Sequence, residues 1–134
     1  MNVARAVAPR SSCIRSQVGA VIVWRNEQIF VGYNGPKSGH PNCDIGGCPR
    51  GLKTFEEMPS GSPFDGPVAC TAIHSEINAW IKFKIWSRAL EKHDMHDAVK
   101  EAVLYSTRKP CEMCQARLLQ WFSPEQIVWD DASA

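Results

Sequence analysis

The sequence predicts an α/β fold in which helices pack on a mixed sheet. Two strand-like stretches form a hairpin pattern near the N-terminus, and helix-like and strand-like stretches then alternate twice in the second half of the chain. A hairpin followed by helix, strand, helix and strand is typical of an α/β sandwich. With 134 residues, the chain is long enough for one domain with its own core.

The N-terminal elements are expected to be a short helix and an antiparallel hairpin. Residues 2–12 are compatible with a short helix that Pro9 interrupts or delays. Residues 17–24 (QVGAVIVW) and 28–34 (QIFVGYN) are rich in Val, Ile and aromatic residues and flank the turn-like RNEQ. This composition predicts two strands that pair with each other.

A long segment over residues 35–69 shows neither a helical nor a strand period. It carries seven of the nine glycines and six of the nine prolines. Segments of this length inside a small domain are usually functional, cross-linked or disordered, and Cys43 and Cys48 favour cross-linking. We therefore expect a single domain over residues 1–134 with a long loop inside it.

The second half of the chain returns to regular patterns. Residues 73–92 space their apolar side chains for one face of a helix. A short apolar strand follows at 101–107, a second helix at 111–122 and a last strand at 125–130. These elements complete the predicted sandwich.

Charge and hydropathy bound the class of protein. Lysine plus arginine (15) nearly balance aspartate plus glutamate (14), so no global field attracts nucleic acid or an anionic membrane. The longest aliphatic run, VGAVIV, is far shorter than the roughly 20 residues that span a bilayer. We expect a soluble cytoplasmic protein, in which six cysteines favour metal binding or catalysis; after export they would permit 15 disulfide pairings.

Two short segments carry residues that suit a metal site. Cys111 and Cys114 lie at i and i+3 in the first turn of a predicted helix, where exposed N–H groups stabilise thiolates. Alone, such a pair also fits a redox disulfide or core packing. His74 adds an imidazole, which makes three ligands for zinc with the fourth position open for water. Glu76 could take and return the proton of that water.

The order of these residues carries a resemblance to a known family. His-x-Glu followed by Pro-Cys-x-x-Cys is the signature of zinc-dependent nucleobase deaminases, and HSE and PCEMC match it. The chain resembles the cytidine and deoxycytidylate deaminase superfamily. SSCIRSQVGAVIV, VGYNGPKSGHPNCDIGGCPRG and CTAIHSEINA are similar to its deoxycytidylate (dCMP) branch. The commoner family form is His-Ala-Glu, whereas this chain has Ser75.

The resemblance implies both a fold and a reaction. The fold is a three-layer α/β/α sandwich with a mixed five-stranded sheet. The reaction is zinc-dependent hydrolysis of dCMP to deoxyuridylate (dUMP) and ammonia. His74, Cys111 and Cys114 would hold the catalytic zinc, which activates water for attack at C4 of the cytosine ring. Glu76 would carry the proton first to N3 and then to the departing amine.

The resemblance also implies residues that bind the nucleotide. Asn34 of GYNG matches an asparagine that lines the nucleotide pocket in this family. Thr107 and Arg108 would form the pocket wall near the ring or the sugar. The monophosphate needs positive charge or free N–H groups, and Arg15, Lys37 and Arg108 are the candidates.

Four cysteines lie outside the catalytic set. Some members of the dCMP branch carry a second, structural zinc, and positions that match Cys13 and Cys43 are ligands there. Cys48 and Cys70 could complete a closed site of four thiolates, with His40 as a substitute ligand. Plain packing of these small side chains is the competing interpretation.

Two other functions fit parts of the pattern. Another deaminase of the superfamily, acting on cytidine or on adenosine in tRNA, shares the zinc signature, although a tRNA enzyme should present a basic surface. A non-catalytic module stapled by zinc would need closed coordination and no Glu76. The resemblance further implies a homo-oligomer and dCTP or dTTP as effectors.

Overall fold

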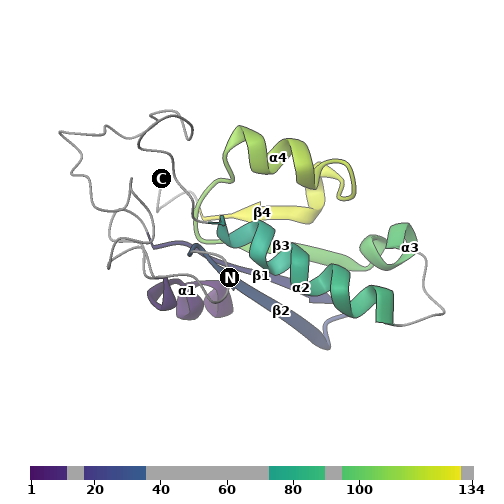
Figure 1. Cartoon of the computed structure of the whole chain (residues 1–134), viewed down its shortest axis with the longest axis horizontal. Helices are drawn as coiled ribbons and strands as arrows, with labels where there is room; N and C mark the ends of the chain where they lie inside the picture. The colour runs from purple at the N-terminus through teal and green to yellow at the C-terminus, as the bar shows by residue number, and fades with distance from the viewer. Residues whose placement is uncertain (12–16, 36–72, 90–94, 131–134) are drawn as a thin grey trace.

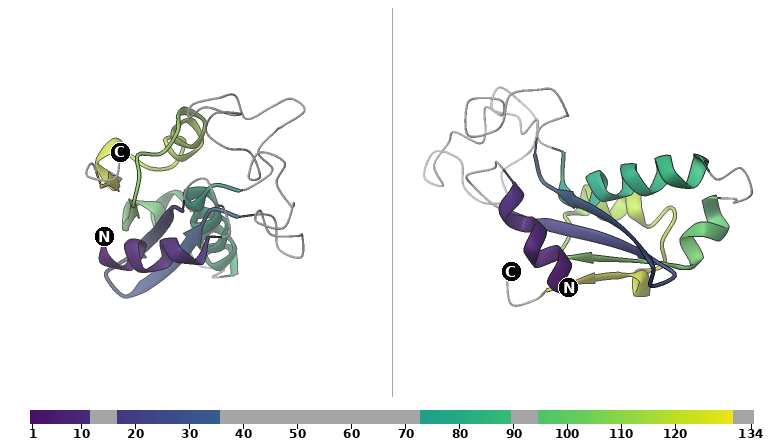
Figure 2. Two further views of the ribbon diagram at one scale, coloured as in Figure 1. Left: turned by 90° about the vertical axis from the view of Figure 1, so that its left-hand side faces the viewer. Right: turned by 90° about the horizontal axis from the view of Figure 1, so that it is seen from below.

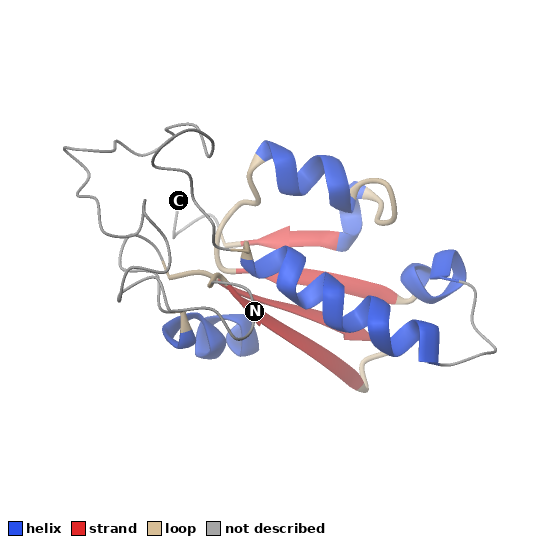
Figure 3. Cartoon of the chain, in the orientation of Figure 1, coloured by secondary structure: helices blue, strands red, loops and turns tan. Residues whose placement is uncertain are grey.

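The protein is an α/β structure built on one mixed sheet (Figures 1 and 3), which confirms the predicted fold class. The computed structural model describes residues 1–11, 17–35, 73–89 and 95–130. Within them the strands run in the order β2-β1-β3-β4. Their bounds are β1 Gly19–Trp24, β2 Gln28–Tyr33, β3 Ala102–Ser106 and β4 Ile127–Trp129.

The predicted hairpin is present as β1 and β2. Both residues at the centre of its turn, Arg25 and Asn26, have positive φ angles, 51° and 58°. Two successive left-handed residues give the turn a twist that matches antiparallel strands. β1 then pairs antiparallel with β3 on its other side, so it is buried between two neighbours.

β3 and β4 pair in parallel, which makes the sheet mixed. A parallel pair needs a crossover connection, and here the connection carries α4 (Glu112–Leu118) and a short 3₁₀ turn η4 (Pro124–Gln126). The sheet has four strands within the described residues, so the expectation of a five-stranded sheet was wrong. Only four stretches of the sequence had strand character.

The predicted N-terminal helix is shorter than expected. α1 covers Asn2–Val7 and passes into a 3₁₀ turn η1 at Ala8–Arg10. Pro9 lies in the first turn of η1, where its missing N–H removes no helical hydrogen bond. α1 packs at the start of β1, because a Cβ on Gly19 would meet the backbone of Ala4 and Ala8.

The long central helix α2 (Ser75–Ala89) lies along the hairpin (Figure 1), within the predicted range of 73–92. A Cβ on Gly32 would collide with the backbone of this helix at Ser75 and Ala79. Asn78 and Lys82 of α2 donate hydrogen bonds to carbonyl oxygens of β2, at 2.8 and 2.7 Å. Close packing and side-chain donors therefore tie α2 to β2.

A further helix, α3 (Met95–Lys100), was not predicted, because its six residues are too few for a helical period to show. It buries Ala98 and Val99. Figure 2 shows it near the C-terminal end of α2. The main core lies between one face of the sheet and the helices α2, α3 and α4, and includes Ile22, Phe83, Leu104, Leu118 and Phe122.

No helix in the described part of the chain has the length and apolar character that a membrane span requires.

The contact at Gly32 gives a stability prediction. Gly32→Ala places a methyl group against the backbone of α2, and we expect it to lower the free energy of unfolding by about 1–3 kcal/mol, the usual range for overpacking. Gly35→Ala is the matched control, because its Cβ would lie 3.9 Å from the Tyr33 ring, an ordinary contact. Urea unfolding measures both variants, and equal stability losses would contradict the importance of the Gly32 contact.

Candidate functional site

Two helices begin at the same end of the sheet, where β3 and β4 end (Figure 1). α2 begins at Ser75, directly after His74. α4 begins at Glu112, with Cys111 as its N-cap residue and Cys114 in its first turn. Pro110 precedes this N-cap, as expected for a chain that turns from a strand into a helix. The two motif segments found in the sequence therefore meet in space.

The meeting point holds three potential metal ligands. Nδ1 of His74 lies 3.2 Å from Sγ of Cys114 and 3.5 Å from Sγ of Cys111. All three donor atoms lie within 4.8 Å of one another. Both cysteines are free thiols in this structure, so no disulfide between them supports the alternative of a redox-active pair. One imidazole and two thiols are a donor set that suits zinc, and three protein ligands leave a fourth position for water.

The burial of this cluster also fits a cation. Cys114 is fully buried, and burial raises the pKa of its thiol far above its usual range. The negative charges of Glu76 and Cys111 raise that pKa further. Ligation of a metal ion stabilises the thiolate against these effects. Without a cation, Cys114 is therefore expected to remain a thiol.

Glu76 lies in the first turn of α2 and is only 4% exposed. Its Oε1 accepts a hydrogen bond of 3.1 Å from the hydroxyl of Ser106, which is fully buried at the end of β3. The Ser106 oxygen in turn accepts the backbone N–H of Arg108 at 3.4 Å. The buried Glu76 carboxylate is thus held by a hydrogen bond from the end of β3, the strand that leads to the two cysteines.

The sequence reasoning missed Ser106. The signal available was the alternation along β3, in which Ala102, Leu104 and Ser106 are the buried positions. That alternation places Ser106 on the same face as Leu104, which belongs to the core shared with α2. What it does not reveal is that the first turn of α2 places Glu76 opposite that position.

The expected nucleotide-binding residues have structural contacts of their own. Oδ1 of Asn34 accepts the backbone N–H of Val18 at 2.9 Å. The Thr107 hydroxyl accepts the backbone N–H of Gly19 at 3.1 Å. Both side chains therefore bind the backbone at the start of β1. Asn34 does so from the end of β2, and Thr107 from the end of β3. Arg108 is exposed.

The expectations for a second zinc and for most of the phosphate candidates fall outside the described residues. These are Cys13, Cys43, Cys48, Cys70, His40, Arg15 and Lys37. The second zinc therefore stays a prediction.

Comparison with known proteins agrees with this geometry. Residues 1–130 match the family model described as the cytidine and deoxycytidylate deaminase zinc-binding region. The chain is 34% identical over 134 residues to a deoxycytidylate deaminase of Mycobacterium phage D29, and covers 92% of it. It is 32% identical over 120 residues to a deoxycytidylate deaminase of Schizosaccharomyces pombe, but spans only 32% of that longer protein.

Solved structures show the same fold. The chain resembles the dCMP deaminase of the cyanophage S-TIM5 in its apo form with a TM-score of 0.59 and 24% identity, covering 97% of this chain and 80% of that one. The structure of that enzyme in complex with dCMP and dUMP gives a TM-score of 0.59 at 23% identity, over 98% and 80% of the two chains.

The cluster of His74, Cys111 and Cys114 leads to a prediction about zinc affinity. Cys114→Ala removes a buried ligand, and we expect it to lower zinc affinity by at least about 100-fold, more than loss of an outer partner of a ligand costs. The variant should carry one zinc ion fewer per chain by elemental analysis. Met113→Ala is the matched control on the same helical turn, since Met113 is half exposed and offers no ligand in this cluster. Unchanged zinc content in Cys114→Ala would exclude this site.

Proposed function

The chain belongs to the cytidine and deoxycytidylate deaminase family, and on that premise we propose that it hydrolyses dCMP to dUMP and ammonia. The observation that carries the proposal is the cluster of His74, Cys111 and Cys114 beside the buried Glu76. The relatives at 31–34% identity all bear the name deoxycytidylate deaminase, which supports dCMP as the substrate rather than cytidine or tRNA.

We assign zinc to the three clustered residues. Zinc held there would lower the pKa of a bound water molecule towards 7 and so supply a nucleophile at neutral pH. In the proposed reaction a water oxygen adds to C4 of the cytosine ring, and the bond from C4 to the amino nitrogen then breaks. Ammonia leaves, and the ring becomes that of uracil.

Glu76 carries the protons in this proposal. It takes one proton from the attacking water and gives it to ring N3. It then takes the proton of the hydroxyl formed at C4 and gives it to the amino group, which leaves as ammonia. Its position supports the assignment, because the buried carboxylate lies close enough to the donor cluster for its charge to act on the Cys114 thiol. The hydrogen bond from Ser106 holds one oxygen of the carboxylate and leaves the other for the proton.

Asn34, Thr107 and Arg108 are proposed to form the nucleotide-binding wall. Asn34 and Thr107 fix the backbone at the start of β1, so they would shape this wall partly through that backbone. Arg108 is exposed and follows the strand end that carries Ser106, which suits contact with the phosphate of dCMP.

Several wider features remain proposals that rest on the family. We propose one domain over residues 1–134, with the layering of a three-layer α/β/α sandwich. The contacts of α1 at Gly19 and of α2 at Gly32 support that layering, since these two residues lie on opposite faces of the hairpin. A cytoplasmic location, a homo-oligomer, and dCTP or dTTP as effectors are proposed on the same basis.

The substrate assignment is tested with a panel of dCMP, dCTP, deoxycytidine and CMP. We expect the zinc-loaded protein to deaminate dCMP with the highest kcat/KM, measured as ammonia release. Glu76→Gln should lower kcat by about 100- to 10,000-fold while zinc stays bound, because proton transfer is lost but the ligands are intact. Glu125→Gln, an exposed glutamate on η4, is the control.

Two results would contradict these assignments separately. A zinc-loaded protein that leaves dCMP unchanged would refute the substrate. Full turnover by Glu76→Gln would refute the role of Glu76 and leave the substrate assignment standing.

The contact between Ser106 and Glu76 gives a further prediction. Ser106→Ala removes the hydrogen bond that joins the end of β3 to the Glu76 carboxylate, and we expect kcat to fall about tenfold with KM within about twofold. Ser106→Thr keeps the hydroxyl and should recover most of the rate. A purely structural role would instead lower the free energy of unfolding of both variants and leave kcat of the folded fraction unchanged.

A further inference from the structure

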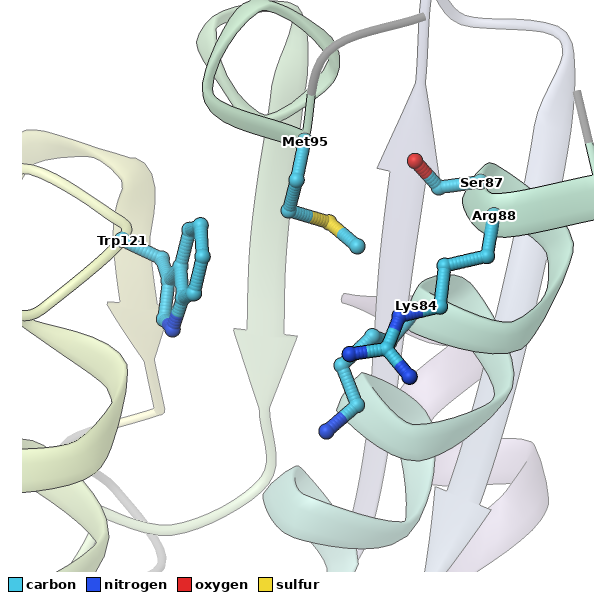
Figure 4. Close-up of a pocket in the computed structure, with 5 residues that line it drawn as sticks. All are labelled: Lys84, Ser87, Arg88, Met95 and Trp121. Atoms are coloured by element: carbon cyan, nitrogen blue, oxygen red, sulfur yellow. The ribbon is translucent and has the colours of Figure 1, made fainter. Parts of the chain in front are cut away.

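A second concave site lies at the far end of α2 from the metal centre. The cavity has a volume of about 180 Å³. It is formed by the last two turns of α2, the start of α3 and the turn after α4. Figure 4 shows its lining side chains, which are Lys84, Ser87, Arg88, Met95 and Trp121.

Two cationic side chains reach this cavity from one face of α2. Lys84 and Arg88 are four residues apart, so they lie one above the other on the helix surface. Within the described part of the chain, neither has an ion pair or a hydrogen bond to another side chain. Both charges are therefore available to a ligand, although the net charge of the whole chain is only +1.

Ser87 adds a hydroxyl that lacks a partner. Ser87 is 1% exposed, and its side-chain oxygen makes no hydrogen bond with any residue that the structure describes. A buried hydroxyl without a partner costs about 1–3 kcal/mol. Because Ser87 also lines the cavity, a ligand with a hydrogen-bond acceptor could remove this cost.

The opposite wall favours a compact ligand over a stacked base. The Trp121 ring stacks on His96 with centroids 4.6 Å apart and contacts the Trp80 ring at 5.6 Å. The Trp121 ring is therefore already packed against the rings of His96 and Trp80. Met95 supplies a second apolar surface. Two cations and one hydroxyl facing such a wall match a small oxyanion.

We propose that this cavity binds the phosphate group of a small phosphorylated ligand, at a site separate from the metal centre. Ser87 follows Glu76 by 11 residues of α2, which corresponds to about 16 Å along the helix. Lysine and arginine both bind phosphate oxygens, and the Ser87 hydroxyl can donate to a third oxygen. The site does not depend on the proposed deaminase activity.

Isothermal titration of the zinc-loaded full chain with inorganic phosphate tests the proposal. We expect saturable binding that Lys84→Gln and Arg88→Gln each weaken at least about fivefold, and that Ser87→Ala weakens less, since it removes a neutral group. Lys82→Gln is the matched control: it removes the same charge from the same helix, but its ammonium group bonds the carbonyl of Val31. Its dissociation constant should stay within about twofold of that of the unchanged protein.

A parallel titration with ribose 5-phosphate separates free phosphate from a phosphate ester as the source. Tighter binding of either one, weakened by Lys84→Gln and Arg88→Gln, supports the site. The proposal is overturned if phosphate does not bind saturably, or if it binds equally to all four variants. It is also overturned if Lys84→Gln changes the sedimentation coefficient but not phosphate binding, because the cavity would then be a contact between subunits.

Discussion

The close contact between α2 and the hairpin sets the position of everything at the functional end of the sheet. Gly32 permits this contact, because any larger residue would meet the backbone of α2 at Ser75 and Ala79. Asn78 and Lys82 then fix the helix along β2 through that strand's carbonyl groups. Packing restricts the separation of helix and strand, while the hydrogen bonds restrict sliding. Together they determine where the N-terminus of α2 lies.

The parallel pair of β3 and β4 fixes the other half of the site. A parallel connection must cross over, so α4 begins near the end of β3 and returns along the sheet. This arrangement takes Cys111 and Cys114 to the end of the sheet where α2 also begins. Ser106, the last residue of β3, reaches Glu76 from the same place. The donor cluster and the buried Glu76 are thus positioned by two independent structural constraints.

The sequence predicted the parts of this site that depend on local pattern. The motifs HSE and PCEMC were enough to select His74, Cys111 and Cys114, because these residues lie at or next to the starts of two helices and leave a recognisable local pattern. The contact of Ser106 with Glu76 could not be predicted, since it depends on how two distant elements pack. α3 was missed because it is short, and the fifth strand was expected from resemblance alone, without a stretch of strand character behind it.

The charges and the burial of the donor cluster make its protonation depend on metal binding. Burial and the negative charges of Glu76 and Cys111 all raise the pKa of the Cys114 thiol. Without a cation, this thiol keeps its proton. A divalent ion reverses this balance, because it favours both thiolates and offsets the charge of Glu76. Metal binding and proton release are therefore coupled at this site, and the fold already holds the three donor atoms within 4.8 Å of one another.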